Sequence, residues 1–270
     1  MFGDFKFFLL MIRYLFKLRE EDILKAYENF PEGFEIVENK PSGEYVIAVY
    51  TEEELKSFPF HLMGKEEVVY RDWKEYYKPV TISDKTVVIP PWEVANGEFA
   101  DKTALIINPG KAFGTGLHES TQLTLLLMEE EELRGKRVWD VGCGSGILSI
   151  FAAKKGAKEV LAIDIDPLAV EETVENAKLN KVEGVVKAQK GEPKDIEGTY
   201  EVVVANLELP IFEKVLKDIT PKIGKIAIFS GIYRLGELID FLKLLEEQKL
   251  KPTKVVEKND WYALRVVKNL

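Results

Sequence analysis

From Arg137 onward the sequence alternates between strand-like and helix-like segments, and this alternation restricts the fold more than any other feature. Apolar, β-branched runs such as RVWDVG and EVLAIDID are followed by helical patterns such as ILSIFAAKKG and PLAVEETVENAKLN. The pattern continues to LGELIDFLKLLEEQK. Strands that alternate with helices in this way form a parallel sheet with helices on both faces. The sequence therefore predicts a doubly wound α/β domain.

The end of the chain departs from this alternation. The strand patterns KPTKVVEKND and WYALRVVKNL are joined through Asn259 and Asp260, which leaves no room for a helical crossover. Strands connected so tightly must be antiparallel. We therefore predict a doubly wound sheet of seven strands that ends in an antiparallel hairpin, which is a narrower class than a plain dinucleotide-binding fold.

The first part of the chain has a different order of elements. It predicts, in sequence, a strand at 5–16, a helix at 19–30, a hairpin around Pro41–Gly43, a helix at 52–58 and a strand at 60–70. This βαββαβ order is that of a small α+β, ferredoxin-like domain. The aromatic and charged stretch RDWKEYYKPV is predicted as a connecting helix. We expect a first domain at 1–66, a helical linker at 67–80 and the α/β domain at 81–270.

Composition narrows the classes of function. A formal net charge of -9 argues against general affinity for phosphate backbones, which requires surplus Lys and Arg. One cysteine cannot form an intramolecular disulfide, and two histidines do not favour a metal centre. The run FKFFLLMIRYLFKL is interrupted by charges and is shorter than the ~20 apolar residues of a membrane span. We expect a cytoplasmic protein, and the 31% of charged residues with only three glutamines favours a heat-adapted source.

Three glycines follow the strand RVWDV at every second position. Gly142, Gly144 and Gly146 give G-x-G-x-G, which is not the G-x-G-x-x-G register of nicotinamide and flavin sites. Asp140 at the end of the strand would repel a diphosphate and suits a ligand with a positive end. A glycine turn alone is common, so a purely structural turn remains an alternative at this point.

Two polar residues at the ends of later strands strengthen the interpretation as a ligand site. Asp164 ends LAID and comes 22 residues after Gly142, which is the spacing of a carboxylate that hydrogen-bonds ribose hydroxyls. Asn206 ends VVVAN, where its amide could accept a hydrogen bond from an amine. The alternatives are a solvated aspartate and an asparagine that satisfies a turn. Asp166 is predicted to cap the helix that begins at Pro167.

Together, DVGCGSG, AIDID and VVANL resemble motifs of the class I S-adenosylmethionine-dependent methyltransferases. NPGKAFGTGLHEST, DVGCGSGILSI, VVVANL and the WKEYYKPV and VVIPPWE stretches are more specifically similar to the ribosomal protein L11 methyltransferase family (PrmA). The resemblance is close over about 70–270 and is one of pattern before that. It implies a bacterial enzyme that transfers methyl groups from S-adenosyl-L-methionine to lysine and N-terminal amines of one large-subunit ribosomal protein, L11. It also implies that a mobile N-terminal module recognises this protein.

The resemblance also implies roles for individual residues. It places Thr121, Gly142, Asp164 and Asn206 on the cofactor, with Gly144 in the same turn. Phe113 and the glycines of the loop 114–116 would cover the cofactor, and Asn206 is the candidate catalytic residue. No nucleic acid, membrane or metal partner is implied.

The sequence also departs from the family pattern. It has Asn108 where the family usually has Asp, His118-Glu119-Ser120-Thr121 where His-Pro-Thr-Thr is usual, and LELP after Asn206. The last change borders the expected substrate pocket, so other protein-lysine substrates and ribosomal RNA remain alternatives. A nicotinamide dehydrogenase and a non-enzymatic binding module are disfavoured by the glycine register and by the full motif set. His118 is expected to organise a helix start rather than to act as a base, and Cys143 is expected to be inert.

Overall fold

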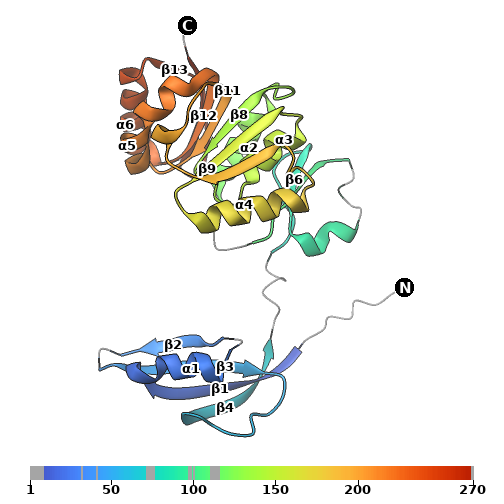
Figure 1. Ribbon diagram of the computed structural model, residues 1–270, viewed down its shortest axis with the longest axis vertical. Coiled ribbons are helices and arrows are strands. Elements are labelled where there is room, and N and C mark those ends of the chain that lie inside the picture. Colours follow the sequence, from blue (N-terminus) through green and yellow to red (C-terminus); the bar gives the residue numbers. More distant parts are fainter. Residues whose placement is uncertain are drawn as a thin grey trace. The chain divides into compact units, whose positions relative to one another are not determined.

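The computed structural model describes residues 9–31, 33–40, 42–70, 77–96, 99, 101–109 and 116–268. The chain divides into two compact units, Met1–Tyr76 and Tyr77–Leu270. Figure 1 draws the first unit in blue and the second in the colours from cyan to red. Each unit has a hydrophobic core of its own.

The first unit is an antiparallel sheet with one helix across it (Figure 1). Its elements are β1 (Leu9–Arg19), α1 (Ile23–Asn29), β2 (Glu35–Asn39), β3 (Glu44–Thr51) and β4 (His61–Tyr70). The strand order is β2-β3-β1-β4, and each neighbouring pair is antiparallel. Its core is aromatic, since Phe16 stacks on Phe30 with 5.5 Å between ring centroids and both are buried.

The predicted helix at 52–58 is wrong, because residues 52–60 form no helix. Instead, the backbone N–H of Leu55 donates to Tyr14 Oη at 3.1 Å, and the Phe58 ring lies 5.9 Å from the Tyr14 ring. A segment this short gains little from helix formation by itself, and contacts with the aromatic core decide its conformation. The described residues do not complete the βαββαβ pattern, so the ferredoxin-like prediction is not confirmed.

The predicted linker helix also differs from the structure at both of its ends. Strand β4 continues to Tyr70, residues 77–79 are not helical, and Val80 already begins the next strand. The stretch between them, 71–76, lies outside the described residues.

The second unit contains the predicted seven-stranded sheet. In chain order its elements are β8 (Arg137–Val141), α3 (Ile147–Lys154), β9 (Glu159–Asp164), α4 (Pro167–Leu179), β10 (Val186–Lys190), β11 (Tyr200–Asn206), α5 (Leu209–Ile219), β12 (Ile223–Tyr233), α6 (Arg234–Glu247), β13 (Leu250–Lys258) and β14 (Trp261–Lys268). The strand order is β10-β9-β8-β11-β12-β14-β13. The first five strands are parallel, and β14 is antiparallel to both of its neighbours. The predicted hairpin is confirmed, and Asn259 and Asp260 turn it with φ values of 52° and 64°.

Helices cover both faces of this sheet, as the alternation predicted. Along β8, Val138 packs in one core cluster and Trp139 in the other, and both are fully buried. Successive side chains of a strand point to opposite faces, so one strand supplies both cores. Figure 1 shows α5 and α6 together on one side and α3 and α4 on the other, where α2 (Glu119–Glu129) also packs.

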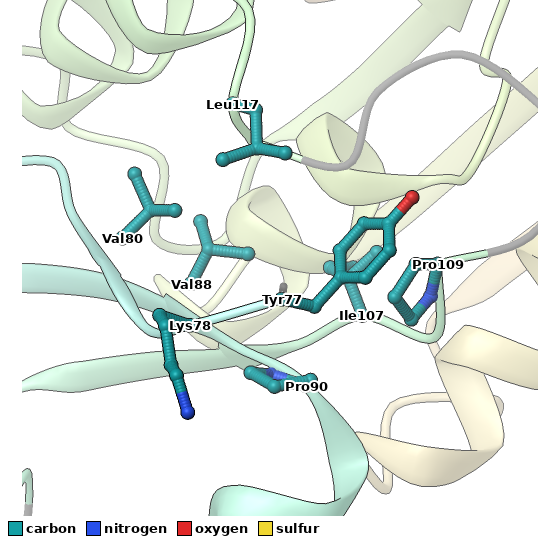
Figure 2. A pocket seen from close by; sticks show the side chains of 8 residues that line it. All are labelled: Tyr77, Lys78, Val80, Val88, Pro90, Ile107, Pro109 and Leu117. Atoms are coloured by element: carbon teal, nitrogen blue, oxygen red, sulfur yellow. The ribbon is translucent and has the colours of Figure 1, made fainter. Parts of the chain in front are cut away.

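A three-stranded sheet precedes α2. It contains β5 (Val80–Thr81), β6 (Thr86–Ile89) and β7 (Thr103–Ile106), with β6 and β7 parallel. An apolar recess lies against it, and Figure 2 shows Lys78 directed away from the other lining side chains. The lining residues are Tyr77, Lys78, Val80, Val88, Pro90, Ile107, Pro109 and Leu117. Among the described residues this lining has no acid and no hydroxyl apart from the Tyr77 phenol, and it includes none of Gly142, Asp164 and Asn206, so it is not the polar site that the motifs predicted.

Candidate functional site

The motif residues meet at the carboxyl edge of the large sheet. In the register of the sheet, Val141 pairs with Ile163 on one side and with Ala205 on the other. The next residue of each strand is therefore at the same level, and these residues are Gly142, Asp164 and Asn206. Ligands of open α/β sheets bind at this edge, beyond the carboxyl ends of the strands. The parallel topology thus brings together three residues that span 64 positions in the sequence, from 142 to 206.

The turn after β8 requires its glycines. Gly142, Gly144 and Gly146 have φ values of 74°, 52° and 79°, in the left-handed region that favours glycine. A Cβ atom on Gly142 would lie 2.5 Å from Leu207 Cδ2. The N–H groups of Gly142 and Cys143 donate to the carbonyl of Ile163 at 2.8 and 3.0 Å, which ties the turn to β9.

Asp164 organises this turn as well as facing the edge. Its Oδ2 accepts the N–H of Gly144 at 3.1 Å, and its Oδ1 accepts the N–H of Asp166 at 3.0 Å. An ionised carboxylate has about four lone-pair sites, so acceptor capacity remains for two hydroxyl groups. The ribose role of Asp164 stays a prediction. The predicted cap at Asp166 is confirmed, since its Oδ1 accepts the N–H of Leu168 at 2.9 Å.

Thr121 and Asn206 are in contact, although 85 residues separate them. Asn206 Nδ2 donates to Thr121 Oγ1 at 3.3 Å, and Thr121 is buried in the first turn of α2. Ser230 on β12 holds this helix start in place, because its Oγ donates to the carbonyl of Ser120 at 3.2 Å. The structure therefore places Thr121 beside the strand ends, and its contact with a cofactor stays a prediction.

Two of the candidates, Phe113 and Gly114, lie outside the described residues. Gly116, where the description resumes, is buried with φ at 85°. A Cβ atom at this position would lie 2.8 Å from Val88 Cγ2, so the backbone at Gly116 lies close to β6.

His118 organises the start of α2, as expected. Its Nδ1 accepts the N–H of Ser120 at 3.2 Å, and its ring packs against Trp261 with 4.4 Å between centroids. The hairpin turn reaches the same place, because Asn259 Nδ2 donates to Glu119 Oε1 at 3.0 Å. The end of the sheet thus supports the helix start that carries Thr121.

Asp140 lies beneath the glycine turn rather than at its surface. Its carboxyl group is fully buried, and its Oδ2 accepts both the N–H and the Oγ–H of Ser149, at 3.1 and 2.6 Å. Its Oδ1 has no hydrogen-bond partner in the described part of the chain. Burial raises the pKa of Asp140 to about 7, against which the bonds from Ser149 act.

Cys143 has no nucleophilic character in this position. Its thiol is buried and lies 3.2 Å from Thr173 Oγ1. Burial raises the pKa of the thiol, so Cys143 stays protonated and the expectation of an inert cysteine fits the structure.

Sequence reasoning missed the buried polar residues of α4 and its C-cap, which bond to the glycine turn or to β7. Thr173, Asn176 and Asn180 are buried, and all three contact the site or the strand beside it. Their spacing of i, i+3 and i+7 puts polar side chains on the helix face that is normally apolar. This spacing of polar residues was the feature of the sequence that could have identified them. No group of three metal-ligating side chains and no helix suited to crossing a membrane occurs among the described residues.

Comparison with known proteins identifies similar chains. The family model for ribosomal protein L11 methyltransferase (PrmA) matches residues 20–269. The ribosomal protein L11 methyltransferase of Aquifex aeolicus is 42% identical over 256 residues, which cover 95% of this chain and 98% of that protein. The protein of the same name from Caldicellulosiruptor saccharolyticus is 38% identical, over 91% of this chain and 81% of that one. The crystal structure of ribosomal protein L11 methylase from Lactobacillus delbrueckii subsp. bulgaricus superposes with a TM-score of 0.63 at 33% identity. It covers 70% of this chain and 98% of its own.

Proposed function

Because the chain belongs to the ribosomal protein L11 methyltransferase family (PrmA), we infer that it is an S-adenosylmethionine-dependent methyltransferase whose substrate is ribosomal protein L11. The methyl groups go to amino groups, of lysine side chains and of the N-terminus. Methylation of ribosomal RNA is not favoured, since the relatives that match most of this chain carry the name of a protein methyltransferase. With this substrate, we propose that the enzyme is cytoplasmic.

The meeting of Gly142, Asp164 and Asn206 at one level of the sheet edge carries this proposal. Gly142 lets a ligand approach the backbone where a Cβ atom has no room. Asp164 retains acceptor capacity for ribose hydroxyls. Asp140 lies under the turn, and its Oδ1 has no hydrogen-bond partner among the described residues, which suits a cationic ligand bound on the turn. These residues fit S-adenosylmethionine, and we propose that Thr121, Gly144 and the loop residue Phe113 complete its binding site.

The reaction needs positioning more than it needs acid or base catalysis. When bound, the cofactor supplies a methyl group on a sulfonium, which is already a good leaving group. The protein must place the acceptor amine in line with this methyl group and exclude water. Neither His118, whose Nδ1 accepts the N–H of Ser120, nor the buried Cys143 is assigned a role as a general base.

Asn206 is suited to orient the acceptor amine. Because Asn206 Nδ2 donates to Thr121 Oγ1, the amide oxygen is the atom left to accept an N–H from the amine. A lysine amine with pKa ~10.4 costs about 4.6 kcal/mol to deprotonate at pH 7. Desolvation beside a cationic cofactor lowers this pKa. An amide oxygen that accepts one N–H would then direct the nitrogen lone pair at the methyl group.

The first unit is proposed to recognise the protein substrate. Each cofactor motif lies after residue 108, in the second unit. The sequence placed the end of this domain at residue 66, and the compact unit of the structure ends at Tyr76. A separate unit of this kind can bind L11 and present several of its amines in turn.

Calorimetric titration and methyl transfer test the proposal together. The purified full-length protein should bind S-adenosylmethionine and its demethylated product, and it should not bind NAD. With radiolabelled cofactor it should label L11, and it should not label ribosomal RNA offered at equal concentration. Tighter binding of NAD would contradict the assignment of the glycine turn, and labelling of RNA alone would contradict the substrate.

A further inference from the structure

Helix α4 buries a row of polar side chains against the glycine turn. Thr173, Asn176 and Asn180 are 0%, 1% and 6% exposed. A helix that only covered a sheet would place apolar side chains on this face. Buried polar groups are costly unless they are hydrogen-bonded, so the partners of these three residues indicate what the row does.

Asn176 joins two separate segments of backbone. Its Nδ2 donates to the carbonyl of Ser145 in the glycine turn at 2.9 Å, and its Oδ1 accepts the N–H of Asn108 at 3.0 Å. Asn108 lies just after β7, on the segment that continues towards the start of α2. One buried amide thus holds the turn after β8 at a set distance from the exit of β7.

Thr173 and Asn180, on either side of Asn176 in the row, each bond to only one of these two backbone segments. Thr173 bonds to the turn, since its Oγ1 donates to the carbonyl of Gly144 at 2.9 Å and its Cγ2 lies against Gly146. Asn180 bonds to the strand, since it accepts the N–H of Ile106 at 2.9 Å and donates to the carbonyl of Ile106 at 2.6 Å. Asn176 is the member of the row that bonds to both segments.

The strand side of the turn is held by other bonds. The N–H groups of Gly142 and Cys143 bond to Ile163, and that of Gly144 bonds to Asp164. The carbonyls of Gly144 and Ser145 are held from the opposite side by α4. The turn is therefore clamped between β9 and α4, and its shape depends on both.

We propose that Asn176 is a positioning residue for cofactor binding, which sets the shape of the glycine turn and its distance from the exit of β7. The proposal rests on the function inferred above. Asn176 acts through the backbone of Ser145 and Asn108 and is not assigned a contact with the cofactor itself. Its loss removes the amide that donates to the Ser145 carbonyl and accepts the Asn108 N–H, and the turn relaxes away from α4.

Asn180 provides a matched control for this role. It is the same residue type, buried at the C-cap of the same helix, and it makes two hydrogen bonds to Ile106 of β7. It makes no hydrogen bond to the glycine turn among the described residues. A merely structural contribution of the row predicts the same behaviour for Asn176→Ala and Asn180→Ala.

The experiment compares the full-length wild type with Asn176→Ala, Asn180→Ala and Thr173→Val. Urea unfolding gives stability, calorimetry gives the dissociation constant for S-adenosylmethionine, and steady-state kinetics give kcat and the KM for L11. We expect both alanine variants to lose similar stability. Asn176→Ala should weaken cofactor binding about tenfold or more, because a buried partner is lost at the turn, while Asn180→Ala should stay within about threefold. The KM for L11 should not change.

Thr173→Val is expected to fold, because valine retains the packing against Gly146 and removes only the bonds of the hydroxyl group to the turn. It should weaken cofactor binding in the same direction as Asn176→Ala. Equal cofactor affinity of the two alanine variants would overturn the proposal. If Asn176→Ala does not fold, unchanged cofactor affinity of Thr173→Val overturns it instead. Failure of the wild type to bind the cofactor would refute the proposed function and is seen before any variant is measured.

Discussion

Replacing Asp140 with asparagine should remove a large part of the dependence of stability on pH between pH 5 and 7. Burial holds the pKa of Asp140 at about 7 in the folded protein. An unfolded aspartate titrates near ~3.9. Between these values the folded state keeps a proton that the unfolded state has lost. The free energy of unfolding contributed by Asp140 is therefore fully present below pH ~3.9 and is lost as pH rises through about 7.

The magnitude follows from the two pKa values. A difference of about three units corresponds to about 4 kcal/mol over the whole titration. Between pH 5 and 7 the wild type should lose about 2 kcal/mol of this contribution, by the linkage relation. The amide introduced by Asp140→Asn does not titrate, so the variant lacks this loss. Asp140 Oδ1 has no hydrogen-bond partner among the described residues, so an amide nitrogen in its place would be unsatisfied. This lowers the free energy of unfolding by an amount that does not change with pH.

Urea unfolding of both proteins at pH 5, 6 and 7 measures this effect. Trp139 is adjacent to the substituted position and buried, so its fluorescence reports the unit concerned. Half-buried carboxylates such as Glu119 and Glu159 have lowered pKa values because they accept hydrogen bonds from Asn259 and Lys187, and they act with the opposite sign. They are the same in both proteins and cancel in the difference. Parallel stability profiles of wild type and variant would refute the reasoning.

Three further changes have expected outcomes. Gly142→Ala puts a Cβ atom 2.5 Å from Leu207 Cδ2, at the end of a flexible side chain, so it should lower the free energy of unfolding in urea by about 1–2 kcal/mol. Calorimetry should show a larger loss in the free energy of cofactor binding. Asp164→Asn should weaken cofactor binding by about 1.5–3 kcal/mol by calorimetry, and near-wild-type binding would show that the ribose assignment is wrong. A fragment of residues 77–270 that folds by circular dichroism should keep its cofactor affinity and lose most radiolabel transfer to L11, and full transfer would remove the recognition role of the first unit.

The large sheet could be predicted because the residues that specify each strand and helix lie within that element or next to it in the sequence. Each strand carries a β-branched run, each helix follows within a few residues, and the two-residue connection at Asn259 permits only an antiparallel pair. The segment 52–58 could not be predicted in this way. Its conformation depends on Tyr14, about 40 residues earlier in the chain, which offers contacts that outweigh a weak helical preference.

The same distinction between local and long-range information applies to the residues of the site. Gly142, Asp164 and Asn206 were accessible to sequence reasoning because each lies at the end of a strand, and parallel strands end at one edge. Asn176 was not, because its partners Asn108 and Ser145 are 68 and 31 residues away and neither follows from the pattern of α4. Asp140 was placed at the right strand end, but its burial beneath the turn depends on Ser149 from the next helix.

The position of β14 inside the sheet bears on how the protein is made. This strand is synthesised after the other six strands of its sheet, yet it lies between β12 and β13. Until it emerges from the ribosome, β12 has an unpaired edge and β13 has no neighbour in the sheet. Trp261, which supports the start of α2 through His118, is also missing until then. The support for the start of α2 therefore completes only after β14 has been synthesised, and nascent chains that stop before β14 carry an open strand edge, which is a template for aggregation.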